Sequence, residues 1–115
     1  ENVTKFKEEN LQAVYQGMYL VTNGSHGTLR TAFNDLPVKV AAKTGTAEED
    51  KNRSSHTWFV CFAPFDDPQI AITVMIPFGE GSGTPAPAVA KAIIREYLGL
   101  DYTPTNTTMQ TVLAE

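Results

Sequence analysis

Apolar residues recur at helical spacing in the first quarter of the chain. Between residues 8 and 22 the spaced positions are Leu11, Val14, Tyr15, Met18 and Val21. This periodicity predicts an amphipathic helix with one buried stripe. The dipeptide Asn23-Gly24 follows it, and such a pair commonly ends a helix in the left-handed conformation.

The same periodicity returns before residue 100. Here the apolar positions are Ala86, Val89, Ala90, Ile93 and Tyr97, which predicts a second helix with a buried stripe. Thr84 is expected to be its N-cap, with Pro85 at the first helical position and Gly99 at the end. Residues 101–115 show no clear period, so we expect an extended or mobile tail.

Between the two helical segments the pattern changes to short runs rich in Val, Ile, Phe and Trp. Residues 37–44, 56–63 and 69–77 predict three strands, and the Pro- and Asp-rich stretch 64–68 makes the last two an antiparallel hairpin. Both alternating sets of 56–63 are apolar, which predicts a central strand covered on both faces. The expected fold class is therefore α/β of the α+β type, a three-stranded antiparallel meander flanked by an N-terminal and a C-terminal helix.

Composition narrows the classes of protein that fit. A chain of 115 residues with 42% hydrophobic residues has room for one core. A net charge of -4, with scattered Lys and Arg, provides no broad cationic surface, so nucleic acid is not an expected partner. No apolar run is long enough to span a bilayer, so any membrane anchor is expected outside this chain. Because the chain begins with Glu1, we expect a portion of a larger protein.

Cysteine usage excludes an internal disulfide, because Cys61 is the only cysteine. Its apolar neighbours in the strand 56–63 predict a buried packing residue in place of a reactive nucleophile.

The first predicted strand runs directly into the polar sequence Lys43-Thr44-Gly45-Thr46. We expect these residues at the end of the strand, where it meets solvent. Lys43, Thr44 and Thr46 are predicted to point into an open groove, with Gly45 at a sheet edge. An ordinary solvent-exposed strand end is the alternative interpretation.

The order of motifs around this element resembles a known family. The helix at residues 9–18, Gly27-Thr28, Phe33, VKVAAKTGTAE at 38–48, WFVCFAP at 58–64, Asp67-Pro68, the strand 70–76 and the helix 88–98 follow one another as in the transpeptidase domain of class B penicillin-binding proteins. The resemblance covers most of residues 8–99 and implies that residues 1–100 are the C-terminal part of that domain.

Two departures from the family pattern stand out. Ala42 occupies a position where the family often has glycine. The family's nucleophile motif Ser-x-x-Lys and relay motif Ser-x-Asn are both missing, since neither begins at Ser25, Ser54, Ser55 or Ser82. The chain is therefore similar to a transpeptidase domain without its catalytic serine.

The resemblance implies roles for four residues. Lys43 would place positive charge beside the serine pair and attract the terminal carboxylate of the substrate. Thr44 and Thr46 would bind that carboxylate through their hydroxyls, and the Thr46 N–H would be one oxyanion donor. Gly45 would allow a substrate strand to approach closely. Lys43 and Thr46 are thus the expected catalytic residues of this chain, and all four residues are expected to bind substrate.

The function implied is that of part of a peptidoglycan D,D-transpeptidase, which cross-links stem peptides through an acyl-serine intermediate and is acylated by β-lactams. The expected location is the extracytoplasmic face of a bacterial membrane, and the expected partners are the stem peptide, β-lactams and the upstream portion of the same protein. No metal or organic cofactor is implied. By itself the chain is expected to be inactive, with Trp58, Phe59 and Phe62 lacking their packing partners.

Other classes of protein remain open at this point. A serine β-lactamase or a β-lactam sensor domain shares the Lys-Thr-Gly element. A noncatalytic extracellular binding module could carry glycans at the four sequons, which begin at Asn2, Asn23, Asn52 and Asn106.

Overall fold

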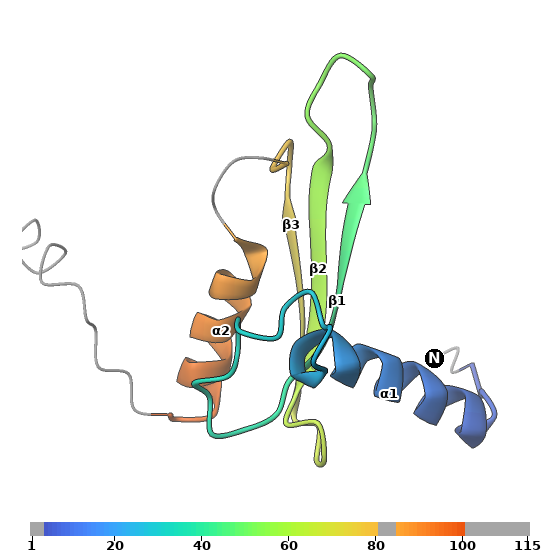
Figure 1. Cartoon of the computed structure of the whole chain (residues 1–115), viewed down its shortest axis with the longest axis vertical. Coiled ribbons are helices and arrows are strands. Elements are labelled where there is room, and N and C mark those ends of the chain that lie inside the picture. Colours follow the sequence, from blue (N-terminus) through green and yellow to red (C-terminus); the bar gives the residue numbers. More distant parts are fainter. Residues whose placement is uncertain (1–3, 81–84, 101–115) are drawn as a thin grey trace, which may run out of the picture.

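The computed structural model describes residues 4–80 and 85–100. Its elements are α1 (Glu8–Asn23), β1 (Ala41–Ala47), β2 (His56–Ala63), β3 (Ile70–Ile76) and α2 (Ala86–Tyr97) (Figure 1). The strands form one antiparallel sheet in the order β1-β2-β3. The predicted α+β meander with a helix before and after it is confirmed. The expected Thr84 cap and the tail at 101–115 lie outside the described residues.

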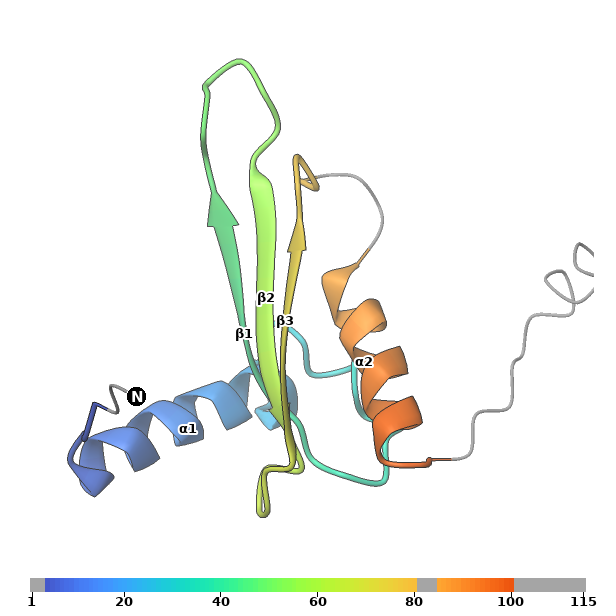
Figure 2. The same ribbon diagram turned by 180° about the vertical axis from the view of Figure 1, so that it is seen from behind.

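Helix α2 covers one face of the sheet and completes the core there (Figures 1 and 2). A cross-strand row joins Ala42, Cys61 and Ile72 on this face, and all three are buried. Phe59 is fully buried beside them, with its ring stacked 6.1 Å from that of Phe33. The residues that α2 contributes to the core are Ala86, Ala90 and Ile94.

Helix α1 crosses one end of the sheet and contacts β1. Thr22 is its only buried residue in the described chain, and the Thr22 hydroxyl donates a hydrogen bond to the Val40 carbonyl. The Asn23 side-chain amide donates to the same carbonyl at 3.0 Å. On the opposite face from α2, the Tyr15 ring meets that of Phe62 edge-on at 5.3 Å. These contacts hold the chain where it enters β1.

The predicted helices are present, but neither of the two predicted stripes is buried throughout. In α1, Val14 is 57% exposed, because most of the helix projects beyond the sheet. In α2 the stripe of Ala86 and Ala90 continues to Ile94, leaving the predicted Val89, Ile93 and Tyr97 exposed. The periodicity predicted each helix correctly, whereas the burial of each stripe depends on which neighbours the chain supplies.

The predicted left-handed end of α1 is wrong. Gly24 has φ -76° and ψ 149°, which is extended backbone. A side chain would nevertheless be excluded there, because a Cβ atom on Gly24 would lie 2.6 Å from the Leu20 carbonyl oxygen. Helix α2 ends just before Gly99, as expected, and Gly99 has the left-handed φ of 63°.

Strand β2 is central, as predicted, but the described residues cover only one of its faces along its full length. Away from α2 the described residues leave Trp58 40%, Val60 39% and Met75 45% exposed. Coverage on both faces is therefore wrong for this chain, because α1 reaches only the end of the sheet where Phe62 lies. The expectation that Phe59 lacks a packing partner is also wrong, since Phe33 and α2 bury it completely.

Candidate active-site edge

The Lys-Thr-Gly element lies inside β1 and not at its end. Pairing with β2 begins at Ala41 opposite Phe62 and continues to Ala47 opposite His56. The predicted strand at 37–44 is therefore displaced at both ends. At the start, the chain before Ala41 is held by other contacts, since the Val40 carbonyl accepts hydrogen bonds from α1 and the Lys39 carbonyl accepts one from Phe65 beyond β2. At the finish, β2 is long enough to pair with every residue as far as Ala47.

The environment of β1 changes abruptly along its length. Ala41 and Ala42 have no exposed surface, whereas every residue from Lys43 to Ala47 is exposed. Because β1 is the first strand of the order β1-β2-β3, one side of it pairs with no other strand of the described chain. Gly45 therefore lies at a sheet edge, and the four predicted site residues share that edge.

The side chains of the element do not point in one direction. Successive residues of a strand face opposite sides of the sheet, so Lys43 and Gly45 lie on the face that carries Trp58. Thr44 and Thr46 lie on the other face, where Thr44 is opposite Phe59. The prediction that Lys43, Thr44 and Thr46 all point into one groove is wrong. The residues are brought together by the strand edge, with Lys43 on one face and the two hydroxyls on the other.

The backbone of Thr46 points outward from this edge. Along a strand paired on one side, the N–H and C=O groups of alternate residues point toward and away from the partner. The Lys39 carbonyl points inward, since it accepts a 2.8 Å hydrogen bond from the N–H of Phe65, just beyond β2. The Val40 carbonyl is bound by α1, outside the sheet. Thr44 and Thr46 lie four and six residues after Val40, so in the alternation their backbone N–H and C=O groups face the same way as those of Val40, toward the open edge.

The Lys43 side chain binds one of these edge carbonyl groups. Its ammonium group donates a hydrogen bond to the carbonyl of Thr44, one of the outward-facing acceptors. An edge strand offers unpaired backbone donors and acceptors to another chain. The open side of β1 thus presents backbone hydrogen-bonding groups, two hydroxyls and one cation.

Nothing within the described part of the chain requires glycine at position 45. Among the described glycines the positive φ is found at Gly99, not Gly45. A Cβ atom added to Gly45 would lie 3.6 Å from the Trp58 Cβ, an ordinary van der Waals contact. The missing side chain therefore relieves no internal clash, and its effect is to leave the edge clear for a molecule approaching from outside.

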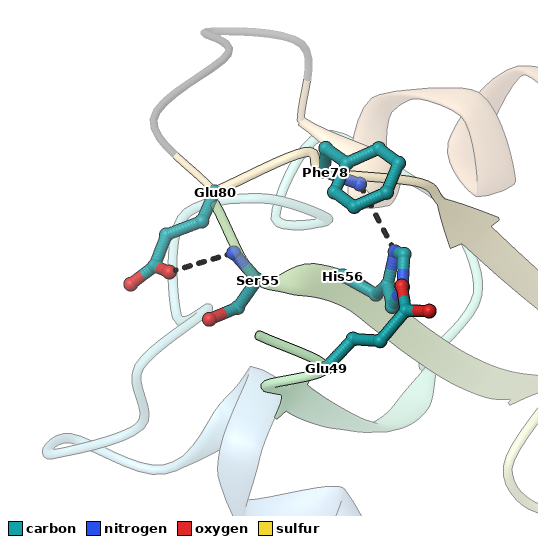
Figure 3. A network of polar contacts seen from close by, with 5 residues as sticks. All are labelled: Glu49, Ser55, His56, Phe78 and Glu80. Carbon is teal, nitrogen blue, oxygen red and sulfur yellow. Dashed lines mark hydrogen bonds and ion pairs between the residues drawn. The ribbon is translucent and has the colours of Figure 1, made fainter. Parts of the chain in front are cut away.

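A polar cluster that the sequence did not reveal adjoins the element (Figure 3). His56, which pairs with Ala47, contacts the Glu49 carboxylate through Nε2 at 3.0 Å and accepts the Phe78 N–H at Nδ1 at 3.1 Å. Along the chain, Glu49 is 7 positions and Phe78 is 22 positions from His56. Glu49 belongs to the charged run 48–53, in which no residue spacing marks it as a partner of His56.

Cys61 is a packing residue, as predicted. It is buried in the core, and this burial raises the pKa of its thiol to about 11. The thiolate, which is the nucleophilic form, is therefore scarce at neutral pH. Within residues 4–80 and 85–100 the structure has no group of three or more His, Cys, Asp or Glu side chains that could hold a metal ion. No helix of this part is both long and apolar enough to cross a membrane.

Comparison with known proteins identifies the family. A family model described as the penicillin binding protein transpeptidase domain matches residues 1–95. The chain belongs to the penicillin-binding protein transpeptidase family. Among curated proteins, this transpeptidase segment is 34% identical over 101 residues to peptidoglycan D,D-transpeptidase MrdA of Haemophilus influenzae. That match covers 76% of the segment and 16% of the relative.

Related sequences and structures agree with that assignment. Penicillin-binding protein 2B of Streptococcus pneumoniae is 33% identical over 102 residues, covering 84% of the segment and 15% of that protein. The crystal structure of Pseudomonas aeruginosa PBP2 in complex with WCK 5153 matches with a TM-score of 0.73 at 34% identity, covering 88% of the segment and 21% of that chain. The resemblance to a class B transpeptidase domain is confirmed, and the segment spans about a fifth or less of these relatives.

Proposed function

We propose that this chain supplies the Lys-Thr-Gly wall of the active site of a peptidoglycan D,D-transpeptidase, while another part of the same protein supplies the nucleophilic serine. The observation that carries the proposal is the open edge of β1, where the Thr44 and Thr46 backbone groups face outward. Relatives that bear the name peptidoglycan D,D-transpeptidase support the reaction class.

The proposed chemistry is acyl transfer. The serine hydroxyl attacks the carbonyl carbon of the penultimate D-alanine of a stem peptide, the terminal D-alanine leaves with a proton, and an amino group of a second stem then displaces the serine. Both steps place negative charge on the carbonyl oxygen. The Thr46 N–H is a fixed donor at the strand edge, and a donor in such a position stabilises that charge without reorganising.

The two faces of β1 suit two different tasks. Lys43 lies on the bare face with Trp58 and Val60, where the rest of the domain would bring the serine pair. Its positive charge would hydrogen-bond the relay serine and attract the substrate. The Thr44 and Thr46 hydroxyls, on the other face, would bind the terminal carboxylate. Gly45 would let the peptide lie along the edge as an added strand.

If the chain is part of such a transpeptidase, its substrates, partner and location follow. The substrates would be stem peptides and their β-lactam mimics, the working partner would be the upstream portion of the same protein, and the location would be the extracytoplasmic face of a bacterial membrane. The segment alone would be inactive, because it would hold an oxyanion donor and a carboxylate site without a group to acylate.

Intact mass after incubation with a fluorescent penicillin tests the proposal. We expect a stoichiometric adduct on the full-length protein that contains this segment, attached to a serine outside residues 1–115, and no adduct on the 115-residue chain alone. A covalent adduct on the isolated chain, at Ser25, Ser54, Ser55, Ser82 or Cys61, would contradict it. Release of the full-length adduct within seconds would favour a β-lactamase instead.

A further inference from the structure

Three segments of the chain meet at one imidazole ring beside the open edge (Figure 3). His56 is the first residue of β2 and lies opposite Ala47, the last residue of β1. Its Nε2 lies 3.0 Å from the Glu49 carboxylate, on the chain leaving β1. Its Nδ1 accepts a 3.1 Å hydrogen bond from the N–H of Phe78, on the chain leaving β3. One side chain thus joins the exits of both outer strands.

The two contacts require the neutral ring in one tautomer. Because Nδ1 accepts the Phe78 N–H, it carries no proton, so the ring proton lies on Nε2 and is donated to Glu49. The imidazole also packs against the Phe78 ring, with centroids 4.6 Å apart. The Arg53 guanidinium lies 5.6 Å from the centroid of the same phenyl ring. Both nitrogens and the ring face of His56 are therefore engaged.

A second pair of hydrogen bonds joins the start of β2 to the chain leaving β3. The Ser55 N–H donates to the Glu80 carboxylate at 3.2 Å, and the Glu80 N–H donates to the Ser55 carbonyl at 3.2 Å. Phe78, two residues before Glu80, has φ 52°, in the left-handed region that a bulky residue rarely adopts. Such a conformation persists where surrounding contacts specify it, and the bond to His56 is one of those contacts.

We propose that His56 is a positioning residue for acylation, acting through Glu49 and Phe78 to fix the end of β1 that carries Thr46. The inference rests on the proposed function. Thr46 pairs with Thr57, the neighbour of His56, and Glu49 is three residues beyond Thr46. The contacts of His56 with the Glu49 carboxylate and with the Phe78 N–H together form a clamp. Without the clamp, the exposed end of β1 is held in the described chain by its pairing with β2 alone. A displacement of about 1 Å in a positioned group costs up to ~100-fold in rate.

Substitutions at His56 in the full-length protein separate the two arms of the clamp. The measurement is the acylation of the protein by a fluorescent penicillin, resolved into the limiting rate constant and the dissociation constant of the preceding complex. We expect His56→Ala to lower the limiting rate about tenfold to 100-fold, with a smaller effect on the dissociation constant. His56→Gln can still donate to Glu49, and His56→Asn can still accept from Phe78, so each is expected to recover part of the rate.

Substitutions at the partner residue test the coupling. Glu49→Ala is expected to slow acylation, and the double variant with His56→Ala is expected to be no slower than His56→Ala alone, because both changes break the same link. Glu48→Ala is the matched control, since it removes the same charge from the adjacent position. It is expected to react at the parental rate.

Two results would overturn the positioning role while leaving the proposed function intact. One is an acylation rate that stays parental in all His56 variants. The other is a loss that disappears once rates are normalised to folded protein, with Gln and Asn no better than Ala. If the parental full-length protein forms no adduct at all, the proposed function fails and this inference fails with it.

Discussion

The two halves of β1 share one partner strand and one continuous register, yet their environments are opposite. Ala41 and Ala42 are fully buried, whereas Lys43 and the residues after it are exposed. The difference arises from what lies over the strand, since α1 and the core under α2 cover only the first half. One strand can therefore be anchored by packing at one end and present polar groups from the other.

This separation has an energetic consequence. Truncating a buried residue removes transfer free energy and leaves a cavity, while changing an exposed residue usually alters stability by less than about 0.5 kcal/mol. Polar groups on a strand that is fixed elsewhere are also held more precisely than groups on a loop. Substitutions in the core under α2 should then affect stability, and those at the exposed residues of β1 should affect chemistry.

The largest effect is expected from the core beneath the strand. Phe59→Ala in the full-length protein should lower the free energy of unfolding by about 3 to 5 kcal/mol, because Phe59 is fully buried against Phe33 and α2. Denaturant unfolding measures this, with Phe59→Leu as the control, expected to cost less than about 1.5 kcal/mol. Equal and small losses for both variants would show that the core under α2 does not anchor the sheet.

The opposite behaviour is expected of Lys43, in the exposed half. Lys43→Ala should slow acylation of the full-length protein by penicillin about 100-fold or more, comparable with losing one oxyanion donor at about 3 kcal/mol. Its free energy of unfolding should change by less than about 0.5 kcal/mol. Lys51→Ala, in the adjoining loop, is the charge-matched control. Parental acylation by Lys43→Ala would contradict the role of this edge.

Cys61 reports on whether the buried face stays closed. Because burial raises the pKa of its thiol to about 11, alkylation by iodoacetamide at neutral pH should be at least about tenfold slower in the folded protein than in urea. Mass spectrometry of the peptide containing Cys61 gives both rates. Similar rates in the two conditions would mean that the face under α2 opens readily.

The smallest effect is expected from an ion pair that joins α2 to the preceding chain. The Asp35 carboxylate contacts the Lys91 ammonium at 2.5 Å and the Arg95 guanidinium at 2.8 Å. Since the Asp35 side chain is 49% exposed, solvent screens the pair, and Asp35→Asn should cost about 1 kcal/mol or less at neutral pH. Chemical denaturation with and without added salt measures this contribution.

The pH dependence of that contribution has a definite sign. The hydrogen bond from Lys91 is the main cause that lowers the pKa of Asp35 in the folded protein. A lowered folded-state pKa stabilises the protein above the unfolded pKa, near 4, and this stabilisation is lost as the pH falls through the folded value. The difference between Asp35→Asn and the parent should therefore disappear in acid. A difference that grew on acidification would contradict the pairing.

The sequence was informative wherever a local pattern determined the structure. The bounds predicted for β2, residues 56–63, agree with the structure, because its continuous apolar run ends at the Pro- and Asp-rich stretch 64–68. The bounds of β1 were predicted wrongly, since the Lys-Thr-Gly-Thr sequence has no apolar alternation and is held in the strand by pairing with β2. The burial of the α1 stripe could not be predicted either, because it depends on which neighbours lie against the helix, and the described residues leave most of it exposed.

Only part of the candidate site could be predicted from the sequence. Lys43, Thr44, Gly45 and Thr46 could be selected because their order resembles a known family, but their distribution over two faces follows only from the register. The clamp around His56 has no sequence signature. It joins residues distant along the chain and uses the backbone N–H of Phe78, whose left-handed conformation no local pattern indicated.

The acylated full-length protein tests directly whether the Thr46 N–H at the open edge of β1 receives the oxyanion. In a crystal structure of the penicillin adduct, we expect the acyl carbonyl oxygen about 2.7 to 3.1 Å from the Thr46 nitrogen. We also expect the carboxylate of the adduct beside the Thr44 or Thr46 hydroxyl. An acyl group whose carbonyl oxygen is bound elsewhere, with the β1 edge left to solvent, would contradict the proposed role of Thr46.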